Sequence, residues 1–225
     1  MKRIGMIVAV EINAVLNKYG TPQEELLHKG MRLMVYNADS YQLYVLNCGI
    51  GEIAAAAGTQ MLISEFGVEM IVNFGVVGGL TEEMALAKTC IVEKVVHYGF
   101  DGSQGLHYPQ GQYPGTDSVY FEASKELIAH AKSMYPDLKS VICASADKFV
   151  ADPDEKRSIH SQFSADICEM EAAGILITAN RNGIPCLLIK TVSDSVEGGA
   201  EEFALQVERS AEICVEIADN IIKGF

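Results

Sequence analysis

Basic residues are scarce in this chain. Only 17 of its 225 residues are Lys or Arg, whereas 30 are Asp or Glu, so the formal net charge is −13. A charge of this sign repels a polyphosphate backbone, which excludes nucleic acid as an expected partner. A small neutral or zwitterionic ligand is compatible with the same charge.

Long apolar runs are also lacking. No segment approaches the roughly 20 apolar residues that span a bilayer, so no membrane association is expected. The N-terminal segment MKRIGMIVAV contains two basic residues and an apolar run. That run ends at Glu11 and lacks the small-residue cleavage site of a signal peptide. We therefore expect a cytoplasmic protein.

Cysteine pairs of the CxxC type are missing too. Six cysteines stand mostly in apolar contexts: Cys48, Cys90, Cys143, Cys168, Cys186 and Cys214. This pattern is typical of buried free thiols in a reducing compartment. His97, His107 and His160 lack the spacing of metal ligands, so no metal site is expected.

What remains is a chain rich in apolar residues. They make up 49% of the sequence, enough for the core of one α/β domain spanning 1–225. Apolar runs predict strands at 4–10, 43–47, 70–74, 90–96, 140–144 and 185–191. Helical composition predicts helices at 11–16, 53–66, 121–134, 172–182 and 201–223. The alternation predicts a mostly parallel sheet covered on both faces, and the glycine-rich stretch 97–120 is expected to be a long loop.

Several of the predicted strands end in glycines or polar residues, which is where α/β sheets bind ligands. The first strand ends at Glu11, the strand at 70–74 is followed by Gly78-Gly79, and the last strand ends at Ser193-Asp194. Single glycine turns are common in strand-to-helix connections, but several at one sheet edge favour a site. Neither a GxGxxG fingerprint nor a P-loop occurs, so a dinucleotide or a nucleoside triphosphate is poorly supported.

Two carboxylates, Glu169 and Glu171, flank Met170 directly before the helix at 172–182. One glutamate there can simply complement the helix dipole, whereas a pair beside an apolar segment indicates a site. Asp194 can likewise cap the next segment or act as a general acid whose pKa is raised by partial burial. Phe149, which follows Asp147-Lys148, can stack on a flat heterocycle or turn into the core.

Three segments together resemble the signature segments of the superfamily of nucleoside phosphorylases and nucleosidases. They are NFGVVGGL (73–80), ICEMEAAGI (167–175) and KTVSDSVEGG (190–199), and the first strand MKRIGMIVAVE agrees as well. The resemblance covers nearly the whole chain and is closest to the methylthioadenosine/S-adenosylhomocysteine nucleosidases. It implies a three-layer αβα sandwich with a mixed, partly barrel-like central sheet. It also implies a homodimer or larger homo-oligomer, and cleavage of a purine nucleoside without a cofactor.

The resemblance also implies a role for individual residues. Asp194 matches the acid that protonates purine N7, and Glu171 matches the carboxylate that binds the ribose hydroxyls. Met170 packs beneath the sugar, Phe149 stacks on the base, and the backbone of Val150 reads the base edge. These roles are chemically reasonable, because a purine anion is a poor leaving group until it is protonated.

The nucleophile side departs from the family pattern. A glutamate after the first strand activates the attacking water in the nucleosidases, and Asn13 aligns with it, while Glu11 lies two residues earlier. A family serine and a family arginine that hold this water are replaced by Val76 and Lys190. The segment after Asp194 is shorter than in the nucleosidases.

Three hypotheses follow. The first is hydrolysis, with Glu11 or a rearranged Asn13 positioning water, and the second is phosphorolysis with phosphate as the nucleophile. The third is a nucleoside-binding protein that has lost turnover. Phe203 is expected to lie in the helix that follows Asp194. The sequence therefore does not define which 5′-group of the nucleoside is recognised.

Overall fold

The structure is a computed structural model that describes residues 1–225, with ten strands and six helices. The strands are β1 (Lys2–Val8), β2 (Glu24–His28), β3 (Met31–Asn37), β4 (Tyr41–Asn47), β5 (Met70–Gly79), β6 (Thr89–His97), β7 (Tyr120–Glu122), β8 (Lys139–Ser145), β9 (Ile167–Glu169) and β10 (Cys186–Asp194). The helices are α1 (Ile12–Tyr19), α2 (Glu52–Phe66), α3 (Lys125–Met134), α4 (Pro153–Phe163), α5 (Ala172–Arg181) and α6 (Ala200–Lys223).

All strands belong to one mixed sheet that closes partly on itself. Strands β5, β10, β6, β8 and β9 form a ring, because β5 pairs with both β10 and β9. Beyond β5 the sheet continues as β1, β4, β3 and β2, and β7 adds to β6. The pairs β1–β4, β1–β5, β5–β10, β6–β8 and β8–β9 are parallel, and the others are antiparallel. The predicted mixed, partly barrel-like sheet is confirmed.

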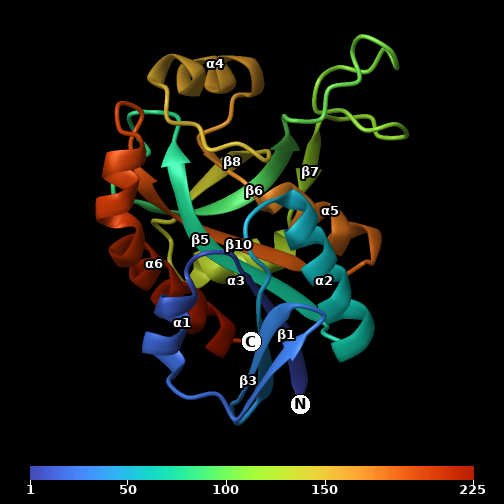
Figure 1. Cartoon of the computed structure of the whole chain (residues 1–225), viewed down its shortest axis with the longest axis vertical. Coiled ribbons are helices and arrows are strands. Elements are labelled where there is room, and N and C mark those ends of the chain that lie inside the picture. The colour runs from blue at the N-terminus through green and yellow to red at the C-terminus, as the bar shows by residue number, and fades with distance from the viewer.

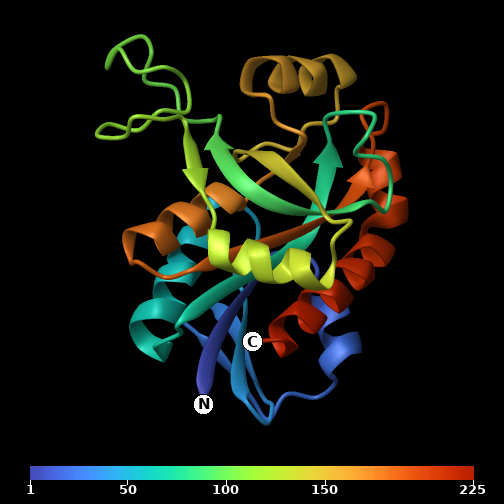
Figure 2. The same ribbon diagram turned by 180° about the vertical axis from the view of Figure 1, so that it is seen from behind.

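Helices cover the sheet from both sides (Figure 1). α1 and α6 pack together on one side, and α2 and α5 pack together on the other. α3 lies along β6 and β10 and is best seen from behind (Figure 2). α4 sits at the top of Figure 1, above the end of the sheet to which β5 and β6 point. No helix combines the length and apolarity that crossing a bilayer requires.

The central strands are apolar throughout, as burial on both faces requires. The larger of two buried apolar clusters, with 53 residues, fills the space between the layers. β10 is unusual because all nine of its residues are buried although it carries Lys190, Thr191, Ser193 and Asp194. Buried polar groups are costly unless they are paired, so their concentration at the carboxyl end of one core strand points to a site.

Several predicted boundaries were wrong. Strand β1 ends at Val8, two residues before the predicted end. The predicted helix at 121–134 begins only at Lys125, because β7 occupies its first two residues and Ser124 caps the helix by accepting a hydrogen bond from the Leu127 N–H. The elements β2, β3, α4 and β9 were not predicted. Residues 98–119 contain no helix or strand, in agreement with the expected loop.

Candidate active site

The site forms where β5, β9 and β10 meet. Gly78 near the end of β5 lies in register with Cys168 of β9 and with Asp194 of β10. A Cβ atom on Gly78 would lie 3.1 Å from both Asp194 Oδ2 and Cys168 Sγ, so glycine allows the three strands to converge here. The segment after β1 reaches the same edge, because β1 runs parallel to β5.

A cavity of about 350 Å³ opens at this edge, a size that suits a small-molecule ligand. Nine of the eleven predicted site residues line it: Glu11, Val76, Phe149, Val150, Glu169, Met170, Glu171, Ser193 and Asp194. Lys190 is buried directly behind it, paired with Glu169. The remaining residue, Asn13, lies elsewhere.

Asn13 is exposed on the first turn of α1 and lines a neighbouring groove between α1 and α6. The structure therefore does not bring Asn13 together with the other predicted residues. The alignment by sequence position led to Asn13, but the chain turns into α1 directly after Glu11, and this turn carries Asn13 away from the cavity.

Glu11 occupies the place where the chain leaves β1. Its side chain is buried, and its two oxygens accept hydrogen bonds from the N–H groups of Val76 at 2.9 Å and Val10 at 3.0 Å. A Cβ atom on Gly75 would lie 2.9 Å from Glu11 Oε1 and 3.4 Å from Lys190 Nζ. Glycine at position 75 thus lets a carboxylate and an ammonium group approach the same stretch of β5.

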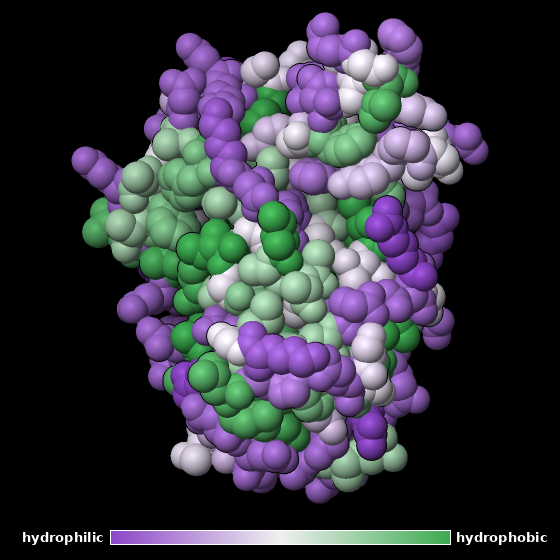
Figure 3. All heavy atoms as spheres, turned by 45° about the vertical axis from the view of Figure 1, so that its right-hand side comes forward, coloured by the Kyte–Doolittle hydropathy of each residue, from purple (hydrophilic) through white to green (hydrophobic).

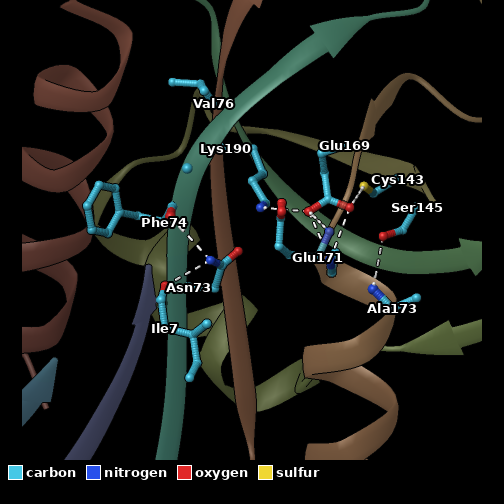
Figure 4. A network of polar contacts seen from close by, with 12 residues as sticks. Ile7, Asn73, Phe74, Val76, Cys143, Ser145, Glu169, Glu171, Ala173 and Lys190 are labelled. Carbon is cyan, nitrogen blue, oxygen red and sulfur yellow. Dashed lines mark hydrogen bonds and ion pairs between the residues drawn. The ribbon is translucent and has the colours of Figure 1, made fainter. Parts of the chain in front are cut away.

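Lys190 and Glu169 form a buried ion pair, with Nζ 3.1 Å from Oε2 and both side chains almost fully buried. Figure 4 shows Lys190 directed at this carboxylate from β10. Glu169 also accepts hydrogen bonds from the N–H groups of Glu171 and Ala172, which open α5. Burial acts to lower the pKa of Lys190, but the adjacent carboxylates, Glu169 foremost, raise it above its ordinary value. Glu169 therefore has little capacity left for a ligand.

Glu171 has more freedom. One carboxylate oxygen accepts a hydrogen bond of 2.8 Å from the N–H of Gly51, at the start of α2. The side chain lines the cavity, and its second oxygen has no partner within the protein. Burial, followed by the negative charge of Glu169, raises the pKa of Glu171 from 4.5 to about 7. This carboxylate can accept hydrogen bonds from hydroxyl groups in the cavity.

Asp194 is the last residue of β10, and both of its carboxylate oxygens have hydrogen-bond partners. Oδ1 accepts a hydrogen bond from the Ser193 hydroxyl at 3.1 Å, and Oδ2 lies 2.6 Å from Lys156 Nζ. Burial raises the pKa of Asp194 above its ordinary value, while Lys156 and Ser193 act in the opposite direction. A buried carboxyl group with such opposing influences is a candidate general acid.

Lys156 was not predicted from the sequence. It lies on α4 and is completely buried, on the same helix face as Ile159 and Phe163. The spacing of these residues, three and seven positions apart, places the lysine in the middle of an apolar stripe. A lysine in such a stripe signals a buried partner, and this pattern was the one clue in the sequence.

Aromatic and apolar groups complete the cavity. Phe149 is 44% exposed and meets Phe203 edge to face with 5.3 Å between ring centroids. Phe203 lies in α6 as predicted, and it nevertheless lines the cavity. Val150 is buried beside Phe149, and Met170 covers the cavity from the segment between β9 and α5. A flat heterocycle fits between such groups.

Comparison with known proteins agrees with this geometry. The family model described as phosphorylase superfamily matches residues 3–225. A Helicobacter pylori aminodeoxyfutalosine nucleosidase is 27% identical over 99% of this chain and 98% of its own length. A 5′-methylthioadenosine/S-adenosylhomocysteine nucleosidase of Listeria welshimeri is 30% identical over 97% of this chain and 99% of its own length.

Solved structures give the same result. The Helicobacter pylori 5′-methylthioadenosine/S-adenosylhomocysteine nucleosidase, in complex with a propynylthiomethyl pyrrolidinol that carries an aminopyrrolopyrimidine, superposes with a TM-score of 0.95. The two chains are 26% identical, and the match covers 100% of this chain and 99% of the other. The similarity thus extends over the sequence and the fold from end to end, and the chain belongs to the phosphorylase superfamily.

Proposed function

We propose that this protein hydrolyses the N-ribosidic bond of a purine nucleoside and releases the free base. The observation that carries the proposal is the convergence of three groups on one cavity: the buried Asp194, the partly unpaired Glu171, and Phe149. They supply an acid, a hydroxyl acceptor and a stacking surface. An acid and a carboxylate of this kind accelerate cleavage of a base–sugar bond.

The chemistry assigns a role to each group. Asp194 donates a proton to the departing purine at N7, so that a neutral base leaves. The Glu171 carboxylate accepts hydrogen bonds from the ribose hydroxyls, and its charge stabilises the positive charge that develops on the sugar. Phe149 stacks on the base, Met170 packs against the ribose, and the backbone of Val150 contacts the base edge.

Glu11 is the residue proposed to activate water. It is buried at the cavity and held by the Val76 N–H, while Asn13 lies outside. Water attacks C1′ as the bond to the base breaks, and Glu11 takes the proton that the water loses. Lys190 Nζ faces the same stretch of β5 as the Glu11 carboxylate.

Phosphate is a poorer nucleophile for this cavity. The one buried cation on the nucleophile side, Lys190, is already paired with Glu169. Glu11 and Glu171 add further negative charge to the cavity lining. An incoming phosphate dianion would be repelled, whereas neutral water would not.

The names of the relatives suggest which nucleosides to test. These relatives act on 5′-methylthioadenosine, S-adenosylhomocysteine or aminodeoxyfutalosine, as their names state. The test is base release from 5′-methylthioadenosine, S-adenosylhomocysteine, adenosine and inosine, with and without phosphate. Release that is independent of phosphate supports the proposal, and release that strictly requires phosphate contradicts it. Tight binding with no release at high enzyme concentration identifies a binding protein.

We also propose that the protein forms a homodimer or a larger homo-oligomer. The first turn of α2 and the segment before it expose apolar side chains, with Ile53 82% exposed and Ile50 60% exposed. Figure 3 shows hydrophobic side chains gathered in the middle of the face that carries α2. Contiguous apolar patches of this kind mark protein–protein contacts. Sedimentation measurements test the assembly.

We place the enzyme in the cytoplasm. All six cysteines are free and buried in the structure, as a reducing compartment allows. Burial raises the pKa of the Cys168 and Cys186 thiols to about 12, which keeps them protonated and unreactive.

A further inference from the structure

Lys156 is a fully buried lysine on helix α4. Its ammonium group contacts the carboxylate of Asp194. Its Nζ atom has three acceptors: Asp194 Oδ2 at 2.6 Å, the Ser195 carbonyl at 2.6 Å and the Gly198 carbonyl at 3.1 Å. An ammonium group has three N–H donors and no acceptor, so these partners satisfy all of its protons. The geometry is that of a charged lysine held in one position.

We propose that Lys156 is the positioning residue of the general acid, which fixes the carboxyl group of Asp194 and stabilises the carboxylate that forms when its proton moves to the base. The inference rests on the proposed hydrolysis of a purine nucleoside. Lys156 is not itself among the residues that line the cavity, and it reaches the reacting atoms only through Asp194.

Lys156 and Ser193 together fix the orientation of the Asp194 carboxyl group. The Lys156 ammonium holds Oδ2 and the Ser193 hydroxyl holds Oδ1, so the carboxyl group cannot rotate freely. Ser193 Oγ also lies 3.2 Å from the Val77 carbonyl on β5, so the one hydroxyl hydrogen is shared between these two acceptors. A proton-transferring group that is fixed in this way needs no reorientation when the base begins to leave.

Lys156 also provides a positive charge beside Asp194. Proton transfer from Asp194 to the base leaves a carboxylate in a buried position, where a lone negative charge is costly. An ammonium group at 2.6 Å offsets that cost as the charge develops. Lys156 therefore makes Asp194 a stronger acid than burial alone would allow.

Besides Lys156, the charged group with the largest influence on Asp194 is Glu202. Glu202 of α6 acts on Asp194 with a negative charge, and its Oε2 accepts hydrogen bonds from the N–H and the hydroxyl of Ser195. Cys168 of β9 lies close by but stays protonated. Lys148 lines the same cavity but pairs with Glu155, so Lys156 is the positive charge that is paired with the acid, and its removal has a predictable sign.

The test uses Lys156→Met, which keeps most of the side-chain volume, and Lys156→Gln as a second variant that retains a hydrogen-bond donor. Lys139→Met is the matched control, because Lys139 pairs with Glu83 and Asp166 at the start of β8. Circular dichroism and thermal unfolding establish that each variant is folded. The kcat/KM for the wild type's preferred purine nucleoside is then followed against pH.

Two changes are expected together in the Lys156 variants. Loss of a positive charge next to an aspartate raises its pKa by about one to three units, so the high-pH limb of the profile moves upward by that amount. The plateau of kcat/KM falls by about three- to thirty-fold, since a weaker acid transfers its proton less readily, with a Brønsted sensitivity of roughly one half. Lys139→Met leaves both features unchanged.

A substrate with an activated leaving group separates positioning from general damage. 4-Nitrophenyl β-D-ribofuranoside releases its leaving group without protonation, so the Lys156 variants should cleave it at a rate close to that of the wild type. An equal loss on both substrates without a shifted limb overturns the proposal, as does an unchanged profile. A wild type that releases no base contradicts the proposed function instead. In that case a carbon-13 NMR titration of Asp194 decides, with a higher midpoint in Lys156→Met expected and an unchanged midpoint overturning the proposal.

Discussion

Glu11 Oε1 accepts a hydrogen bond of 2.9 Å from the Val76 N–H, whereas Asn13, two residues along, is exposed outside the cavity. We therefore expect Glu11→Gln to lower kcat by about a hundred- to ten-thousand-fold, because the amide cannot take a proton from water. Asn13→Ala should change kcat/KM less than two-fold, roughly as for other surface positions. A gain in hydrolysis on Asn13→Glu would show that the base belongs at position 13. Steady-state base release measures all three variants.

Asp194→Asn should leave the fold intact and lower turnover by about a hundred- to ten-thousand-fold, because the amide cannot protonate the departing base. Calorimetry should still detect nucleoside binding, since Phe149 and Glu171 remain in the cavity. An undiminished rate would remove Asp194 from the role of general acid. Loss of binding together with turnover would instead indicate that the residue mainly holds the site together.

The pKa of Glu171, which burial and then Glu169 raise to about 7, predicts a pH effect on binding. The protonated group cannot accept hydrogen bonds from both ribose hydroxyls, so KM should fall as the pH rises through 7. Glu171→Gln should raise KM and remove this dependence. A 2′,3′-dideoxynucleoside serves as the control, because it lacks the hydroxyls. A pH-dependent KM for that substrate would assign the effect to another group.

The sequence was sufficient for the parts of the fold that depend on local pattern. Continuous apolar runs located the core strands, and glycines marked their ends. The hairpin β2–β3 was not predicted because polar and apolar residues alternate only weakly in β2, where Glu24 and Glu25 are adjacent and Leu27 is exposed. Closure of the sheet by β9 could not be read from three residues, because it depends on the pairing of Cys168 with Gly78.

In the candidate site, too, some residues could be predicted from the sequence and others could not. Asp194, Glu169 and Glu171 adjoin apolar strands, so their positions at the sheet edge follow from the chain itself. Lys156 lies on α4, and the position of this helix next to Asp194 depends on tertiary packing, which the sequence pattern does not predict. The choice between Glu11 and Asn13 depends on where β1 gives way to α1, and strand ends are read from sequence only to within a few residues.

Replacing one partner of the Lys190–Glu169 ion pair should destabilise the protein more than replacing both partners. Lys190→Met leaves the Glu169 carboxylate buried without its partner, and we expect a loss of about 3–5 kcal/mol in the free energy of unfolding. The double variant Lys190→Met/Glu169→Gln should recover a large part of this loss. Urea unfolding of the single and double variants gives the coupling. Simple additivity of the two single losses would contradict the pairing.

Glu52 predicts an unusual dependence of stability on pH. It is buried at the start of α2, where its carboxylate accepts hydrogen bonds from the Ser145 hydroxyl and the Gly174 N–H. Burial, followed by the charge of Glu169, raises its pKa from 4.5 to about 8. Between these values the folded state binds more protons than the unfolded state, so the Glu52 contribution to stability falls as the pH rises, by at most about 1.4 kcal/mol per pH unit.

Glu52→Gln is the variant that isolates this effect, because glutamine keeps the shape and an acceptor oxygen but does not titrate. Its thermal midpoint should decline less than that of the wild type between pH 5 and 8, in the window set by the shift above. Glu171 titrates in the same window, so Glu171→Gln is measured alongside and the double variant should be flatter than either single one. Parallel curves for wild type and Glu52→Gln would show that Glu52 stays ionised in the folded protein, held by Ser145 and Gly174 against the cost of burial.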